Sequence, residues 1–126
     1  KMEEYDRAIA YFGGALGIFK RVIHKKYSGH FGANHGHLGA AYAAKKDYAK
    51  AVEHFVQALE IFLEVFGEKH PNIARAKRDL GLALVETGEK KKGMKYLEAA
   101  KDMFIATEGA GYIETKELVE KLRELK

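Results

Sequence analysis

A helix-like pattern of apolar residues recurs along this chain at a nearly constant interval. The first copy consists of Tyr5, Ala8, Phe12, Ala15, Ile18, Phe19 and Val22. The second copy consists of Tyr48, Ala51, Phe55, Ala58, Ile61, Phe62 and Val65. A weaker third copy consists of Gly93, Leu97, Ala100, Met103 and Phe104. A fixed period of about 42 residues predicts a repeat protein whose units bury their apolar faces against one another. Such proteins usually act by presenting a surface.

A second pattern alternates with the first. It consists of Phe31, Leu38, Gly39 and Tyr42, and then of Ile73, Leu80, Gly81 and Leu84. Apolar residues at three- and four-residue spacing predict amphipathic helices, and no segment alternates as a strand does. The fold class is therefore expected to be all-α, a solenoid of antiparallel helix hairpins. We expect six helices, at residues 2–24, 31–44, 47–66, 71–86, 89–107 and 112–125.

Proline and glycine mark the expected helix ends. Pro71 suits the first turn of a helix, where a missing N–H costs nothing. Gly67 and Gly109 follow two long helices at equivalent places and are predicted to be left-handed C-terminal caps.

Gly39 and Gly81 are expected to let a neighbouring helix approach closely, because glycine has no side chain. Ala51 and Ala58 are expected to supply the small surface of the partner helix. Arg123 occupies the next equivalent position, and an arginine cannot allow such an approach. Residues 112–125 are therefore predicted to form a polar capping helix.

Composition limits the class of protein. With 126 residues the chain is expected to be a single domain, 1–126, which opens inside a helix pattern. Residues 1–24 are then the second helix of a truncated repeat, followed by repeats at 31–66 and 71–107. The net charge is only +4 and cysteine is absent, which is compatible with a cytoplasmic location. The sequence has no signal-peptide pattern and no apolar run long enough to span a membrane.

The repeated residues resemble the tetratricopeptide repeat. Those that match its motif are Leu38, Gly39, Tyr42, Tyr48, Ala51, Phe55 and Ala58. The second repeat matches less closely, because Lys90, Gly93 and Leu97 replace motif residues. The 42-residue period and the Phe66–Pro71 junction resemble the long-helix subclass of kinesin light chains. The resemblance implies a right-handed superhelix that acts as a protein-binding scaffold or adaptor.

The resemblance also implies a concave groove, lined by the first helix of each hairpin, that binds a partner peptide or helix. By position, the partner-binding residues are His37, Arg75, Arg78, Asp79, Leu82, Val85 and Glu86. Arg75 and Arg78 share a helix face, and guanidinium groups bind carboxylates well, so a ligand with acidic residues is one expectation. The alternative is a solvated face on which the arginines pair with Asp79 and Glu86.

Other surfaces suggest different functions. Gly13, Gly14 and Gly17 are unusual inside a helix and could be a self-association contact that makes a homodimer. The run Lys90–Lys95 could bind nucleic acid or an acidic membrane weakly.

Catalysis, cofactors and metals are not expected from this sequence. His30, His35 and His37 do not share one helix face, so no metal site is expected. No catalytic motif or cofactor-binding motif is present, and we expect no enzyme activity.

Overall fold

The protein is a curved row of α-helices. The computed structural model describes residues 2–21 and 28–126, and the side-chain environment of residues 2–15 and 29–126. Its helices are α1 (Met2–Arg21), α2 (Ser28–Ala44), α3 (Tyr48–Phe66), α4 (Pro71–Glu86), α5 (Lys90–Glu108) and α6 (Ile113–Leu125). No strand occurs among the described residues. The prediction of an all-α solenoid is confirmed.

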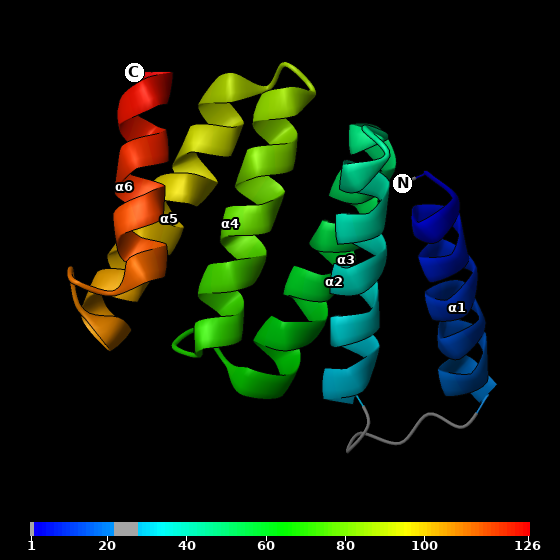
Figure 1. Cartoon of the computed structure of the whole chain (residues 1–126). Coiled ribbons are helices and arrows are strands. Elements are labelled where there is room, and N and C mark those ends of the chain that lie inside the picture. The colour runs from blue at the N-terminus through cyan, green and yellow to red at the C-terminus, as the bar shows by residue number, and fades with distance from the viewer. Residues whose placement is uncertain (1, 22–27) are drawn as a thin grey trace.

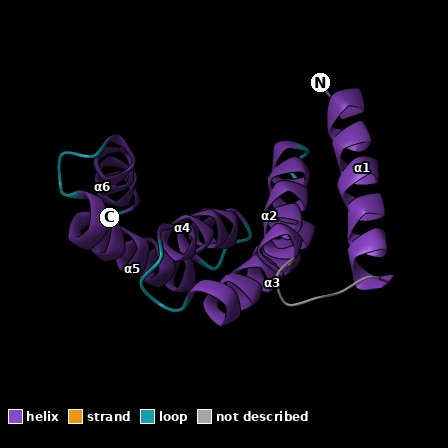
Figure 2. Cartoon of the chain, turned by 90° about the horizontal axis from the view of Figure 1, so that it is seen from below, coloured by secondary structure: helices purple, strands orange, loops and turns teal. Residues whose placement is uncertain are grey.

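Each helix packs on its neighbours in the chain, most extensively within the pairs α2–α3 and α4–α5, and the row runs from α1 at one end to α6 at the other (Figure 1). Seen along the helices, α2, α4 and α6 lie on the inner side of an arc, with α3 and α5 on its outer side (Figure 2). The first helix of each hairpin is therefore placed on the concave face, as the sequence resemblance implies.

Most helix boundaries fall within one residue of their expected positions. The second helix differs, because it begins at Ser28 and not at residue 31. Its extra turn is supported by tertiary packing, since a Cβ on Gly29 would lie 3.4 Å from the ring of Phe66. Because the contact involves a glycine, the apolar pattern of the sequence does not indicate that the helix begins there. The predicted end of the first helix, at residues 22–24, lies outside the described residues.

The glycine caps differ in one respect from the prediction. Gly67 and Gly109 have φ angles of 77° and 91°, but their ψ angles are 179° and 161°. These values lie outside the left-handed helical region, in an extended region that only glycine adopts readily. The chain therefore leaves α3 and α5 in an extended direction. After α3 it reaches Pro71 at the start of α4, where Nδ1 of His70 accepts a hydrogen bond from the Asn72 N–H at 3.1 Å.

Two glycines make the closest contact between α4 and α5. A Cβ on Gly81 would lie 2.8 Å from the carbonyl oxygen of Gly93, and a Cβ on Gly93 would lie 2.6 Å from that of Gly81. Close approach at Gly39 is also present, but the atoms that its Cβ would meet belong to the ring of Phe55. Bulky apolar side chains, and not only small ones, therefore fill the space that a helical glycine leaves.

The last helix contributes a narrow apolar face. Leu118 and Leu122 are buried in a cluster with Leu97, Ala100 and Phe104 of α5. Arg123 lies on the outer side of α6, with 72% of its side chain exposed, and pairs with Glu120 at 3.2 Å. Position 123 therefore makes no close helix crossing like the one at Gly81.

Candidate peptide-binding groove

Three adjoining hollows lie along the concave face, and together they are called the concave groove. Their volumes are about 260, 390 and 560 Å³. The first lies between α2, α3 and α4, the second reaches from α2 and α3 across α4 to α6, and the third lies between α4 and α6. The chain thus has an elongated depression that follows α4 beside α2 and extends across α4 to α6.

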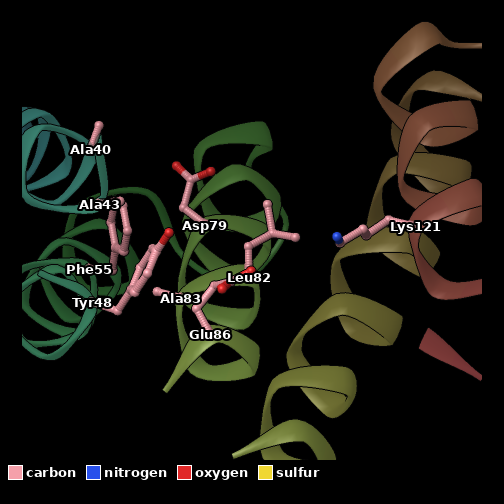
Figure 3. A pocket seen from close by; sticks show the side chains of 9 residues that line it. All are labelled: Ala40, Ala43, Tyr48, Phe55, Asp79, Leu82, Ala83, Glu86 and Lys121. Atoms are coloured by element: carbon pink, nitrogen blue, oxygen red, sulfur yellow. The ribbon is translucent and has the colours of Figure 1, made fainter. Parts of the chain in front are cut away.

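The middle hollow has an apolar floor with charged residues at its sides. Ala40 and Ala43 of α2 and Phe55 of α3 line one side of this hollow. Ala83 of α4 points toward them, and Leu82 of α4 points toward α6 (Figure 3). Small side chains on α2 leave room for a guest side chain. The hollow can therefore accept an apolar group of a ligand.

Asp79 lies at the centre of the groove, because it lines all three hollows. Its Oδ1 accepts a hydrogen bond from Nε of Arg78 at 3.2 Å, and 36% of its side chain is exposed. Desolvation raises the pKa of Asp79 above its ordinary value, although the positive charge of Arg78 opposes that shift. Any ligand that crosses the groove must pass over this carboxyl group.

Arg75 and Arg78 are held by Glu114 of α6. Nη1 of Arg78 lies 2.8 Å from Oε2 of Glu114, and Nε of Arg75 lies 3.5 Å from the same atom. The hydroxyl of Tyr112 donates to Oε1 of Glu114 at 3.0 Å and accepts from Nη2 of Arg75 at 3.4 Å. The two arginines therefore contact a carboxylate of the chain itself.

The charge state of Glu114 reflects these contacts. Desolvation acts to raise its pKa, but the hydrogen bond from Tyr112 and the charges of Arg78 and Arg75 together lower the pKa below its ordinary value. Glu114 is therefore held as a carboxylate, and it connects α6 to α4 at one end of the groove. The guanidinium carbon of Arg78 also lies 6.0 Å from the ring centre of Phe104, within range of a cation–π contact.

Six of the seven partner-binding residues expected from the sequence line the groove. They are His37, Arg75, Arg78, Asp79, Leu82 and Glu86. Val85 instead belongs to the α4–α5 interface, where its Cγ2 would lie 2.8 Å from a Cβ on Gly93. The ring of His37 stacks on Phe12 of α1, with ring centres 4.7 Å apart.

Sequence reasoning missed several residues of the lining. They are Tyr48, Phe55, Ala58, Phe62, Asn72, Ala76, Ala83, Glu114 and Leu118. Tyr48 and Phe55 were visible as motif residues, but the resemblance gave them a packing role only. Nothing in the sequence indicated that Glu114 would reach the two arginines.

The two other candidate surfaces lie away from this groove. A Cβ on Gly13 or Gly14 of α1 would meet no atom of the described side chains within 4 Å, and nearby Tyr11 is 72% exposed. The packing of Gly17 lies outside the described residues. The lysines at 90, 91, 92 and 95 are exposed at the start of α5 and line none of the three hollows.

Two histidines meet at the α2–α3 interface. Nδ1 of buried His35 lies 3.1 Å from Nδ1 of His54, and the ring of Tyr42 stacks on His54 at 5.4 Å. Among the described residues, no group of three or more potential ligands is placed to hold a metal ion. The two histidines are thus joined by a hydrogen bond and by ring stacking between α2 and α3.

We expect this pair to make stability depend on pH. Desolvation lowers the pKa of His54 below its ordinary value of 6.5; Lys50 acts in the same direction and Glu53 opposes it. Because the unfolded chain then binds the proton more readily, the free energy of unfolding should be highest above this value and fall as the pH drops through it. Urea unfolding between about pH 8 and about pH 5 measures the effect. A His54→Phe variant keeps an aromatic ring but loses the hydrogen bond to His35. It should be less stable and have a shallower slope; an equal slope would contradict this assignment.

The comparisons with known proteins agree with this geometry. The family described as Tetratricopeptide repeat matches residues 31–106, which is more than half of the chain. The chain therefore belongs to the tetratricopeptide repeat family, whose fold generally mediates protein–protein interaction. The solved structure of BtubC (BKLC) from P. vanneervenii is similar, with a TM-score of 0.83 at 18% sequence identity.

The alignment covers different shares of the two chains. The alignment covers 97% of this chain but 48% of the BtubC chain, so this chain spans about half the length of the structure it resembles. A search of curated protein sequences finds no match. Within the described residues, no helix is long and apolar enough to cross a membrane.

Proposed function

We propose that this chain is a scaffold module that binds a peptide or helix of a partner protein in its concave groove. The observation that supports this proposal most directly is the run of three hollows across α2, α4 and α6. Small residues such as Ala40 and Ala43 leave space there, and charged residues at the sides can fix the register of a ligand. The proposed contacts are His37, Arg75, Arg78, Asp79, Leu82 and Glu86. No catalytic role and no cofactor are part of the proposal.

The module is further proposed to belong to the long-helix subclass found in kinesin light chains and to act in the cytoplasm. α3 and α5 begin at Tyr48 and Lys90, and α4 and α6 begin at Pro71 and Ile113, so each pair is offset by 42 residues. This offset and the fold likeness to BtubC (BKLC) support the subclass. The absence of cysteine is compatible with a reducing compartment.

The charge of the ligand is a separate question from its position. Arg75 and Arg78 favour an acidic ligand when the sequence alone is considered. In the folded chain such a ligand would compete with Glu114, which contacts both guanidinium groups. An experiment can therefore contradict the preference for acidic residues without contradicting binding in the groove.

Filling the groove tests its use without changing its charge. Ala40 is exposed and lines two of the hollows, so Ala40→Tyr should obstruct a ligand while leaving the core intact. Peptides are first selected from a random library displayed on phage against the unaltered chain, then synthesised and titrated by calorimetry. We expect Ala40→Tyr to weaken their binding about tenfold or more, the scale at which a steric block removes the main contacts of a site.

A matched variant separates obstruction from a general effect of tyrosine. Ala106 is an exposed alanine of α5 that lines none of the three hollows, so Ala106→Tyr should leave affinity unchanged. Selected peptides that bind Ala40→Tyr as well as the unaltered chain would contradict binding in the groove.

Self-association through α1 is a second candidate, favoured by one observation. Tyr11 is 72% exposed, and the glycines at 13 and 14 leave open space beside it, so another helix could approach closely. Sedimentation velocity over a range of concentrations is expected to show a monomer–dimer equilibrium that Tyr11→Glu abolishes. A monomer at every concentration would rule this candidate out.

A further inference from the structure

The concave groove differs in charge from the rest of the chain. The chain has an excess of four basic residues. Among the described residues that line the three hollows, the carboxylates are Asp79, Glu86, Glu114 and Glu117, whereas the cations are Arg75, Arg78 and Lys121. The groove is thus slightly acidic on a basic protein, which is the reverse of what its two arginines suggest when they are considered alone.

Pairing within the chain sharpens this difference. Both arginines contact Glu114, and Arg78 also contacts Asp79, so their charges are largely compensated. Glu86 and Glu117 form no ion pair with any described side chain, and both are exposed. Lys121, which extends from α6 toward Leu82, is the cation of the groove that no described carboxylate pairs (Figure 3).

Asp79 is the residue of the groove that most restricts the chemistry of a ligand. Its Oδ1 has the hydrogen bond from Arg78, but its Oδ2 has none from the described residues. The carboxyl group is partly exposed to water, and a ligand lying across it removes that water. A carboxylate that loses water must gain hydrogen-bond donors, or it destabilises the complex. A ligand cation supplies the strongest such donors, and a ligand carboxylate supplies none.

A second carboxylate continues this line along α4. Glu86 follows Asp79 by seven residues, two helical turns, so both lie on one face and about 10 Å apart along the axis. Leu82 lies between them on α4, and its side chain points toward Lys121 of α6 (Figure 3). The order along the axis of α4, beside the middle hollow, is therefore carboxylate, apolar surface, carboxylate.

We infer that the occupant of the concave groove is a peptide segment in which lysine or arginine residues flank an apolar side chain. The inference rests on the proposed function, because it assigns the class of partner for the same groove. The apolar side chain enters the hollow beside Phe55 and Leu82. The flanking cations contact Asp79 and Glu86. A segment rich in acidic residues is disfavoured, since it meets these carboxylates and must displace Glu114 to reach the arginines.

The peptides selected from the phage-displayed library provide the test. We expect lysine or arginine to be enriched beside leucine, isoleucine or phenylalanine. For the synthesised peptides, Asp79→Asn should weaken binding to the full chain about tenfold and Glu86→Gln about threefold, as loss of charge-assisted contacts predicts. Affinity should also fall as salt concentration rises. Glu64→Gln, on an exposed glutamate of α3 outside the groove, is the matched control and should change nothing.

The outcomes separate this inference from the proposed function. Peptides that lose binding to Ala40→Tyr but are rich in aspartate or glutamate, or are unaffected by Glu86→Gln, overturn the basic partner while groove binding stands. Peptides that are insensitive to Ala40→Tyr, or a library that yields no enrichment over beads without protein, overturn the proposed function itself. If Asp79→Asn unfolds the chain, Glu86→Gln decides, because Glu86 is exposed and pairs with no described residue.

Discussion

The substitution Gly81→Val is expected to lower the free energy of unfolding by about 3 kcal/mol or more, which is at the upper end of the losses seen for overpacked cores. A Cβ at Gly81 would lie 2.8 Å from the carbonyl oxygen of Gly93 and 2.8 Å from Cγ of Leu97. Leu97 can change its rotamer, but the carbonyl oxygen belongs to the backbone of α5 and can move only if the whole helix moves. Separating α4 from α5 in turn opens the cluster around Phe104.

A glycine in open space provides the opposite expectation. A Cβ on Gly14 would meet nothing within 4 Å among the described residues, so Gly14→Ala adds a better helix former without a clash there. It should raise the free energy of unfolding by about 0.5–1 kcal/mol, the usual difference between alanine and glycine inside a helix. The same chemistry, addition of carbon at a helical glycine, therefore has opposite signs at the two sites.

Urea denaturation followed by far-ultraviolet circular dichroism measures both variants. The prediction fails if Gly81→Val unfolds at the same urea concentration as the parent chain, since the α4–α5 crossing must then be loose. A destabilised Gly14→Ala would mean that the glycine face of α1 is covered, for example by a second copy of the chain.

The architecture was largely predictable because two features of the sequence constrain it: the repeat period, and the glycine and proline residues at the helix ends. The period gave the number of helices, and glycine with proline gave their ends to within a residue in most cases. The packing role of Gly93 was not predicted. In the sequence it is only a departure from the motif alanine that Ala51 supplies in the preceding repeat. In the structure it makes the closest crossing of α4 and α5, because a glycine faces it there.

The helices that line the groove were predictable, but the individual side chains that line it were less so. Residues of α2 and α4 were placed on the concave face because the first helix of each hairpin lies there. Val85 was expected in the groove, but it follows Gly81 by one turn and so packs on the face that meets α5, outside the three hollows. The contact of Glu114 with the arginines could not be predicted, because it depends on how α6 is placed against α4. No periodic pattern records that placement.

Phe104 determines whether the α6 side of the groove exists at all. Its side chain is fully buried between α5 and α6, 6.1 Å from the ring of Tyr112 and 6.0 Å from the guanidinium carbon of Arg78. Phe104→Ala is expected to cost about 3–5 kcal/mol, the usual loss for a buried phenylalanine. Because repeats are stabilised by their nearest neighbours, the loss should fall on α5 and α6 first and leave α2 and α3 protected.

Amide hydrogen exchange resolves this loss helix by helix. Protection should fall in α5 and α6 of Phe104→Ala and persist in the hairpin of α2 and α3. Ile105, the next residue, is 41% exposed, so Ile105→Ala should leave the exchange pattern close to that of the parent chain. Equal loss of protection in every helix would instead mean that the chain unfolds as one cooperative unit. Since Lys121 and Glu114 reach the groove only from a docked α6, peptide affinity should fall together with the protection of α6, even though Phe104 lines none of the three hollows.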